Sequence, residues 1–327
     1  MTYFMGIDQG GSKTAAIIGD EHGHILGMGK SFGAVHSADG MEKAMQASKN
    51  AFDEALTQAG LDYSDIYGIY GGMSGIDWDY ETDLIVTAMQ DTFSVPRVSI
   101  VNDCLIAMRA ATDSDQCATI CAGSGVNCAV RSGEQQIVFG YYIPDNIQGG
   151  ISIGASAVQK VFDAQAGVDQ ETILTEYITG YFKVSTVDEL LQKRVNGEIT
   201  SADYLKLPIT VEQAALEGDA VAKRIFENFA IGIVPYVLSG MKKLGIQDSK
   251  VDVVLSGSIF KCKEAILRET VEVELKKAAK NANIIDAIYE PIVGAYLMGL
   301  DSYLGKPSEE VYRTIMREQL NYNILRK

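Results

Sequence analysis

The chain has 327 residues, of which 47% are hydrophobic and 22% are charged, which is the composition of an ordinary globular protein. This length exceeds that of a usual single domain and therefore predicts two domains. The net charge of −15 argues against a surface that binds nucleic acid or an anionic membrane, because such a surface is basic.

Targeting signals and metal motifs are weak in this sequence. No apolar run approaches the roughly 20 residues of a membrane span, and the first residues lack a signal-peptide pattern, so we expect a cytoplasmic protein without a membrane partner. The five cysteines form no Cys-x-x-Cys pair, and their odd number favours reduced thiols. A zinc or iron–sulfur site at Cys117, Cys121 and Cys128 remains the alternative, although Cys121 and Cys128 lie in strand-like runs where a buried thiol is common.

The first predicted element is a β-hairpin over residues 3–18, where an apolar run ends in an acid and a glycine turn before a second apolar run begins. Gly10 and Gly11 allow the backbone to approach a ligand closely, so that successive amide groups can bind phosphate oxygens. Asp8 is placed to hold a hydrated Mg²⁺ ion, which needs few carboxylates. Further donors follow at Ser12, Lys13 and Thr14. An ordinary Gly-Gly hairpin with an edge acid remains the alternative.

The same pattern occurs a second time at residues 119–130, where Gly123 lies 113 residues after Gly10. Again an apolar run meets a turn of small residues and leaves as a second apolar run. Each copy opens one half of the chain. The repeat therefore predicts two similar domains that bind one nucleotide.

The rest of the first half alternates between helical and strand-like patterns. Helices are predicted at residues 37–60, 79–93 and 105–111, and strands at residues 66–70 and 97–101. This alternation is typical of a mainly parallel sheet with helices on both faces, which is an α/β fold.

Asp103 is the residue that we expect to carry the chemistry. It stands where an apolar strand ends and a helix begins, at the edge of an α/β sheet where ligands bind. An aspartate there can accept the proton of a substrate hydroxyl that attacks a γ-phosphate. A helix cap is an equally good interpretation from spacing alone, since Asn and Asp are favoured caps.

The second half is predicted to be mostly helical after its hairpin. A helix is expected from about residue 156 to residue 166, and further helical stretches follow to residue 244. An apolar strand at residues 250–255 ends at Gly257-Ser258, where bare backbone could contact adenine, although an ordinary turn before a helix is at least as common. An apolar helix with small residues on one side begins near residue 290.

Taken together, residues 6–14, Asn102-Asp103, residues 123–127, residues 256–258 and residues 291–295 resemble the BadF-type ATPase and N-acetylglucosamine kinase family of the sugar kinase, Hsp70 and actin superfamily. The resemblance covers nearly the whole chain, in order. It implies two ribonuclease-H-like lobes, at residues 1–114 and 115–327, with ATP in the cleft between them. The final helices from about residue 290 are candidates for packing back on the first lobe.

The resemblance also implies an activity and a set of site residues. It implies an ATP- and Mg²⁺-dependent kinase that phosphorylates a hydroxyl of an amino sugar similar to N-acetylglucosamine, and a homodimer. Asp103 would be the base, and Asp8 would hold Mg²⁺ through water. The phosphates would contact Gly10, Gly11, Ser12, Lys13, Thr14, Gly123, Ser124 and Gly125. Adenosine would contact Gly257 and Ser258, and the sugar would contact His36, Asn102, Asp103 and Asn127.

Two departures from the family pattern put the substrate in doubt. The chain has Val35-His36 where the kinases carry Asn-His, and residues 150–154 lack the acid of their Gly-Asp-Glu-Gly segment. The alternatives are an ATPase activator of a dehydratase or reductase, which carries an iron–sulfur cluster shared between subunits, and a catalytically weak sugar sensor. A Rossmann dehydrogenase is excluded because its glycine turn leads into a helix, whereas both turns here lead into strands.

Overall fold

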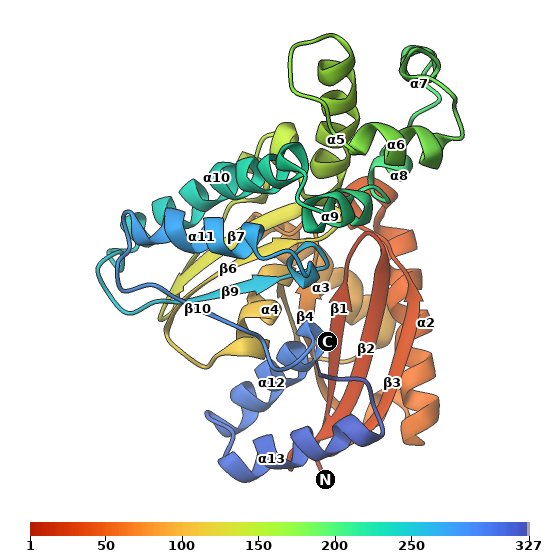
Figure 1. Ribbon diagram of the computed structural model, residues 1–327. Helices are drawn as coiled ribbons and strands as arrows, with labels where there is room; N and C mark the ends of the chain where they lie inside the picture. The colour runs from red at the N-terminus through yellow and green to blue at the C-terminus, as the bar shows by residue number, and fades with distance from the viewer. Residues whose placement is uncertain (326–327) are drawn as a thin grey trace. The chain divides into compact units, whose positions relative to one another are not determined.

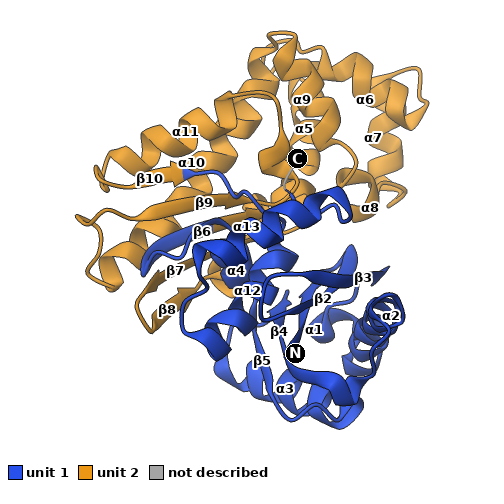
Figure 2. Ribbon diagram, turned by 90° about the horizontal axis from the view of Figure 1, so that it is seen from below, with its two compact units in different colours: residues 1–119, 285–327 blue, residues 120–284 orange. Residues whose placement is uncertain are grey.

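The computed structural model describes residues 1–325 and divides into two compact units (Figure 2). Unit 1 contains Met1–Thr119 together with the chain from Ile285 onward, and unit 2 contains Ile120–Ile284. Each unit is built around a five-stranded sheet with helices, which confirms the predicted α/β class (Figure 1).

The sheet of unit 1 has the strand order β3-β2-β1-β4-β5. β1 and β2 form the predicted antiparallel hairpin, β3 pairs antiparallel with β2, and β4 and β5 continue the sheet in parallel from β1. The strands are β1 (Tyr3–Gln9), β2 (Lys13–Asp20), β3 (Ile25–Phe32), β4 (Ile66–Met73) and β5 (Val98–Asn102).

Helices cover both faces of this sheet because side chains alternate along each strand. Met5 and Ile7 of β1 pack into one core with α2 and α3, and Phe4 packs into the other core with α12 and α13. The helices of unit 1 are α1 (His36–Asp39), α2 (Met41–Ala59), α3 (Asp79–Phe93), α4 (Asp103–Ala111), α12 (Pro291–Leu304) and α13 (Glu309–Arg317).

Unit 2 repeats the topology of unit 1. Its strand order, β10-β9-β6-β7-β8, is the order of unit 1 read from the opposite edge, with a hairpin at the same place. The strands are β6 (Gln116–Ala122), β7 (Val126–Ser132), β8 (Gln135–Val138), β9 (Asp252–Ser256) and β10 (Asn283–Ile285). The duplication that the two hairpins predicted therefore extends to both sheets.

Unit 2 carries more helix than unit 1. Its helices are α5 (Gly149–Gln165), α6 (Leu174–Phe182), α7 (Val187–Val195), α8 (Ser201–Tyr204), α9 (Pro208–Leu216), α10 (Ala220–Lys243) and α11 (Ile266–Lys276). No helix within residues 1–325 is long and apolar enough to cross a membrane.

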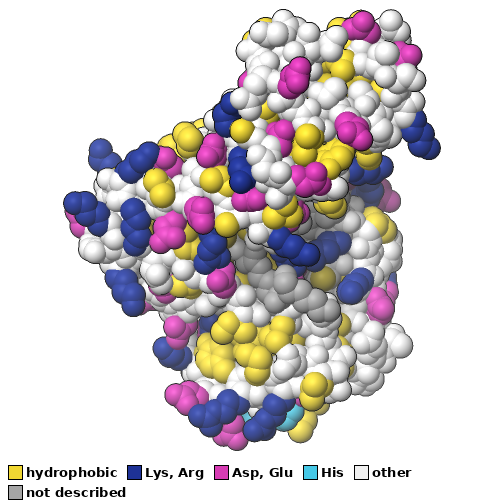
Figure 3. Space-filling model, in the orientation of Figure 1, with side chains coloured by type: hydrophobic (Ala, Val, Ile, Leu, Met, Phe, Trp, Pro, Cys, Tyr) yellow, Lys and Arg dark blue, Asp and Glu magenta, His cyan; other side chains and the backbone are white. Residues whose placement is uncertain are grey.

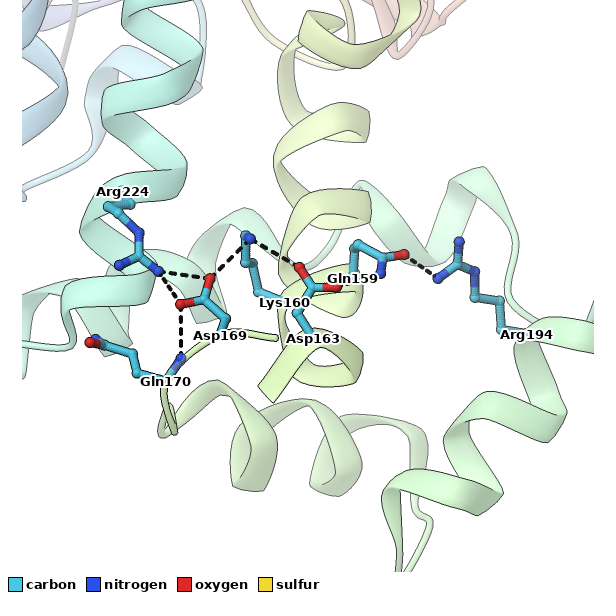
Figure 4. Close-up of polar contacts among 7 residues, drawn as sticks. All are labelled: Gln159, Lys160, Asp163, Asp169, Gln170, Arg194 and Arg224. Atoms are coloured by element: carbon cyan, nitrogen blue, oxygen red, sulfur yellow. Dashed lines mark hydrogen bonds and ion pairs between the residues drawn. The ribbon is translucent and has the colours of Figure 1, made fainter. Parts of the chain in front are cut away.

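A charged network fastens the end of α5 to α10 (Figure 4). The Asp169 carboxylate accepts hydrogen bonds from Lys160 of α5 at 3.0 Å and from Arg224 of α10 at 2.6 and 2.8 Å. The hydrogen bonds from Lys160 and Arg224, with a further one from the Gln170 amide, lower the pKa of Asp169 to about 2. The network helps to fix the axis of α5, whose other end lies at the second hairpin.

Two predicted boundaries are wrong for reasons of backbone geometry. The helix expected from residue 156 begins at Gly149, because the pair Gly149-Gly150, which suggests a loop, forms its first turn. The helix expected at residues 105–111 begins at Asp103, and its N-cap is Asn102, whose side chain accepts a hydrogen bond from the Cys104 amide. The capping alternative considered for Asp103 therefore belongs to its neighbour.

Candidate functional site

The turn between β1 and β2 is narrow and open to solvent at its tip. The Gly10 amide donates to the Lys13 carbonyl at 3.0 Å, and Gly11, Ser12 and Lys13 are exposed. Thr14 differs from these residues, because it is fully buried and its hydroxyl donates to the Phe32 carbonyl at 2.9 Å. Its hydroxyl is thus committed to the sheet, and the exposed donors of the turn are those before it.

Asp8 lies in β1 just before this turn, opposite Ala15. Burial raises the pKa of the Asp8 carboxyl to about 7. The Lys13 ammonium acts against that rise, whereas the negative charges of Asp103 and Glu290 add to it. The structure thus gathers negative charge around Asp8 with one opposing cation, which is a setting that favours an additional bound cation.

Asp103 is the first residue of α4 and is held by Ser74. The Ser74 hydroxyl donates to Oδ2 of Asp103 at 2.5 Å. Burial raises the pKa of Asp103, the Ser74 hydrogen bond opposes this rise, and the negative charge of Asp77 adds to it. A carboxylate with a raised pKa is a better proton acceptor, which suits a general base.

Strand register brings Asp103 and the first turn together. β4 and β5 are parallel neighbours with Met73 opposite Asn102, so Ser74 and Asp103 leave the sheet at one edge. A Cβ on Gly72 would lie 2.8 Å from the Asp103 backbone, so only glycine permits this approach. A Cβ on Gly10 would lie 3.5 Å from the Ser74 hydroxyl, which places Ser74 beside both the turn and Asp103.

Asn102 is buried and bonded to the turn that follows β4. Its amide nitrogen donates to the Ile76 carbonyl and to the Asp77 carboxylate, both at 2.9 Å. The Asp77 amide donates in turn to the carboxylate of buried Glu81 at 2.9 Å. Asn102 therefore lies in the predicted region, but with its donors directed to the protein.

His36 lies at the same end of unit 1, at the start of α1. Its Cε1 is 3.6 Å from the position that a Cβ on Gly75 would take, next to Ser74. Its Nδ1 is buried and has no hydrogen-bond partner among residues 1–325. A buried polar atom without a partner is costly, and a ligand at this position would relieve that cost.

The second turn is supported by the N-terminus of α5. The Gly150 amide donates to the Gly123 carbonyl at 2.8 Å, and the Ile151 amide donates to the Ser124 carbonyl at 3.3 Å. These bonds engage the Gly123 and Ser124 carbonyl oxygens, so the first turn of α5 holds the second turn in place. Gly149 has a φ of +56°, and a Cβ there would lie 2.2 Å from the Gly125 carbonyl oxygen, so this junction requires glycine.

The other predicted residues of unit 2 lie at both sides of this turn. Gly257 follows β9, and a Cβ on Gly257 would lie 2.1 Å from the Ala122 carbonyl oxygen, while the Ser258 hydroxyl is 4.0 Å from the Cβ position of Gly123. Asn127 is in β7, and its Oδ1 accepts the Cys128 amide at 2.7 Å. The structure thus brings Gly257 and Ser258 to the second turn.

Neither the cysteines nor the pocket beside α12 adds a residue to the candidate site. Cys117 and Cys128 are buried, and Cys121 is half-buried. Within residues 1–325, no three His, Cys, Asp or Glu side chains are grouped to hold a metal ion. A pocket of about 500 Å³ in unit 1 contains none of the predicted residues. Its walls include Ile288, Leu297, Tyr312 and Met316. Hydrophobic side chains are also exposed on the face of the molecule that Figure 3 shows.

The sequence did not reveal Ser74, Asp77 and Gln148. Ser74 and Asp77 follow a glycine-rich strand end, and the spacing of residues there matches no known motif. A polar residue directly after a parallel strand is nevertheless a usable signal. Gln148 lies 3.8 Å from the Cβ position of Gly125 and donates to the Ile143 carbonyl at 2.7 Å. Its signal is the Gly-Gly pair that follows it.

Known proteins resemble the chain over most of its length. It is 25% identical over 319 residues to the N-acetyl-D-glucosamine kinase of Dictyostelium discoideum, covering 91% of this chain and 98% of that protein. It is 24% identical over 265 residues to the N-acetylmuramic acid/N-acetylglucosamine kinase of Clostridium acetobutylicum, covering 80% and 86%. A match of 25% identity over 242 residues to the glucosamine kinase of Vibrio cholerae covers 73% and 80%.

Solved structures show the same fold. A protein of Chromobacterium violaceum described as a candidate N-acetylglucosamine kinase has a TM-score of 0.70 at 21% identity, covering 91% of this chain and 99% of its own. A ROK family glucokinase of Streptomyces griseus, solved with glucose and AMPPNP, has a TM-score of 0.59 at 16% identity, covering 92% and 98%. Residues 5–299 match the BadF/BadG/BcrA/BcrD ATPase family, which confirms the resemblance seen in the sequence. The chain belongs to the BadF/BadG/BcrA/BcrD ATPase family.

Proposed function

We propose that the protein is an ATP-dependent kinase that transfers the γ-phosphate to a hydroxyl group of an amino sugar similar to N-acetylglucosamine. The observation that carries this proposal is the arrangement at the carboxyl edge of unit 1, where Ser74 holds Asp103 beside the Gly10 turn. The kinase names of three relatives over 73% to 91% of the chain support the same substrate class.

The residues of unit 1 account for the chemistry of the transfer. Asp103 accepts the proton of the sugar hydroxyl while the oxygen of that hydroxyl forms a bond to the γ-phosphorus. The bond between the γ-phosphorus and the bridging oxygen breaks at the same time, which releases ADP. Ser74 orients the Asp103 carboxylate through its hydrogen bond. The exposed donors of the first turn, Ser12 and Lys13, bind phosphate oxygens.

Mg²⁺ fits the residues present. Asp8 is a carboxylate in a concentration of negative charge, and Mg²⁺ retains most of its waters and needs few protein ligands. When bound, the ion neutralises charge on the phosphates. We assign Asp8 to hold it through water.

The hairpin of unit 2 contributes neutral contacts. Gly123, Ser124 and Gly125 form a turn whose carbonyl oxygens are engaged by α5, and Gly257 and Ser258 lie beside it for the adenosine. Residues 150–154, which lack the acid expected in the family, form the start of α5. The preferred amino sugar of this chain can therefore differ from N-acetylglucosamine. The cytoplasm, expected from the sequence, supplies the ATP, and a homodimer is expected from the resemblance.

Product identification tests this function. The protein is incubated with ATP and Mg²⁺ and with N-acetylglucosamine, glucosamine, N-acetylmuramic acid or glucose, and the products are examined by ³¹P NMR. A new sugar phosphate with at least one amino sugar, absent with Asp103→Asn, is the expected result. ADP and free phosphate without a sugar phosphate would overturn the proposal and favour an ATPase activator or a sensor.

A further inference from the structure

Asp77 is a second carboxylate at the carboxyl edge of the unit 1 sheet. It lies in the turn between β4 and α3, and the parallel register of β4 and β5 brings this turn to the place where Asp103 begins α4. The negative charge of Asp77 acts on Asp103, which also places the two carboxylates near each other. The kinase chemistry described above does not use Asp77.

Asp77 is fixed through its backbone as well as its side chain. The Asp77 and Trp78 amides donate to one carboxylate oxygen of Glu81 at 2.9 and 3.0 Å, and Glu81 is only 4% exposed. The Asp77 carboxylate accepts a hydrogen bond from Asn102 at 2.9 Å. A half-buried carboxylate held in this way is presented in one orientation, which is what recognition of a small ligand requires.

The Asn102 side chain uses all of its hydrogen-bond donors to hold Asp77 and the turn after β4. A primary amide has two hydrogens to donate, and here they go to the Ile76 carbonyl and to Asp77, while its oxygen accepts from the Cys104 amide at 2.9 Å. Asn102 is 2% exposed. The Asn102 side chain, which the sequence predicted to contact the sugar, therefore has no hydrogen left to donate to it. The Asp77 carboxylate, which Asn102 holds, is the group that can contact the sugar.

A ligand at this place is also indicated by His36. Its buried Nδ1 has no partner within residues 1–325, and its ring lies against Gly75, two residues before Asp77. Sugars present several hydroxyl donors close together, and a carboxylate offers about four acceptor positions, so it binds one more donor beside those that it already accepts. Charge-assisted hydrogen bonds of this kind are strong and directional.

We propose, resting on the kinase function above, that Asp77 binds a hydroxyl group of the sugar other than the one that reacts, and that Asn102 is the positioning residue that holds Asp77. Asp103 then acts on the attacking hydroxyl, and Asp77 sets which part of the sugar faces it. This assignment makes Asp77 a determinant of sugar specificity.

The test compares Asp77→Asn with the control Asp79→Asn. Asp79 is an exposed residue at the start of α3, and its substitution removes the same negative charge. Sugar KM, kcat and ATP KM are measured with the preferred sugar and with analogues that lack one hydroxyl at a time. We expect Asp77→Asn to raise sugar KM about 10- to 100-fold with little change in ATP KM, since it loses a hydrogen bond to a charged group. Because the Asp77 charge raises the pKa of Asp103, its loss should also move the acidic limb of the kcat–pH profile to lower pH, and kcat above that limb should change little. Asp79→Asn should behave as the wild type.

The analogues separate contact from structure. One analogue should lack the hydroxyl that Asp77 binds. With the wild type, the KM of this analogue should exceed that of the parent sugar by the same factor by which Asp77→Asn raises the KM of the parent sugar. With Asp77→Asn, the KM values of the analogue and the parent sugar should agree within about twofold. Asn102→Ala should raise sugar KM by a similar factor, and adding it to Asp77→Asn should cost nothing further. An Asp77→Asn enzyme with wild-type KM, or with losses that add fully to every analogue, overturns this inference while the kinase function stands. A wild type that phosphorylates no sugar and shows no heat of sugar binding overturns both.

Discussion

The turn between β1 and β2 and the turn between β6 and β7 occupy the same place in their sheets but differ in charge. The 113-residue offset aligns Asp8 with Cys121 and Lys13 with Val126. Both copies keep glycines in the turn, yet only the first copy carries an acid and a cation. We therefore expect the charged groups of the reaction to come from the first turn and neutral contacts to come from the second.

The two turns also differ in what supports them. The second is bonded to the N-terminus of α5 through the Gly150 and Ile151 amides. The first lies beside Ser74, whose hydroxyl also holds Asp103. A change in the second turn should therefore affect ATP binding alone, and a change in the first turn should affect the chemical step as well.

The largest expected difference is between Asp8→Asn and the aligned change Cys121→Ser. Asp8→Asn should lower kcat by about 10³-fold, because it removes the carboxylate assigned to Mg²⁺. Cys121→Ser should stay within about twofold of wild type, since its position carries no charge in the reaction. Steady-state rates over a range of Mg²⁺ concentrations measure both, and equal losses in the two variants would contradict the division of roles.

Gly149→Ala tests the support of the second turn. A Cβ at this position meets the Gly125 carbonyl oxygen at 2.2 Å and takes a φ of +56°, so unfolding should become easier by about 3 kcal/mol and ATP KM should rise about tenfold. Gly167→Ala is the matched control, because its φ is +71° but nothing lies within 4 Å of the new Cβ. It should cost about 1 kcal/mol and leave ATP KM unchanged. Urea denaturation and ATP titration distinguish the two, and a normal ATP KM in a folded Gly149→Ala would count against the support.

The burial of Asp8 predicts a pH-dependent cost in stability. Its pKa is about 7 in the folded protein and near 3.8 when unfolded, so the folded state binds the proton more tightly. The favourable contribution is complete below pH 4 and is lost as the pH rises toward 7. Without nucleotide or Mg²⁺, Asp8→Asn should therefore be more stable than wild type by on the order of 4 kcal/mol at pH 8. The gain should vanish at pH 4 in urea denaturation, and a gain of equal size at both values would refute the assignment.

The smallest of these effects belongs to Ser74→Ala. Its hydroxyl lowers the pKa of Asp103, so its loss should shift the acidic limb of the kcat–pH profile to higher pH and reduce kcat about tenfold near neutrality. Ser99→Ala, on an exposed position of β5, is the control and should leave the profile unchanged. An unshifted profile in Ser74→Ala would show that this hydrogen bond does not tune the base.

The fold could largely be predicted because its signals are local. The first hairpin, its repeat and helix α2 each carry a periodic apolar pattern that ends at glycine, and α2 indeed ends at Gly60 in a left-handed conformation. β8 and β10 are short strands of 4 and 3 residues and were not predicted. So short a segment has no periodicity of its own and is fixed by pairing with its neighbour.

The site could be predicted only in part, because hydrogen-bond partners depend on tertiary structure. Asp8 near the end of β1, Asp103 after β5 and the glycine turns stand at positions relative to strands that the sequence pattern indicates, so they could be proposed from the sequence. Thr14 and Asn102 have suitable side chains at suitable positions, yet the fold bonds them to Phe32 and to the Ile76–Asp77 turn. The alternation of strands and helices predicted a mainly parallel sheet, but no pattern in the sequence gives the register of β4 and β5. That register is what brings Ser74 and Asp77 to Asp103.

The most direct test of this account is ADP release by wild type and by Asp103→Asn, with and without the preferred amino sugar. We expect the sugar to stimulate the wild type and Asp103→Asn to lose about 10³-fold of the stimulated rate, while slow hydrolysis without sugar is the same in both. A stimulated rate that survives in Asp103→Asn would contradict the assignment of Asp103 as the base.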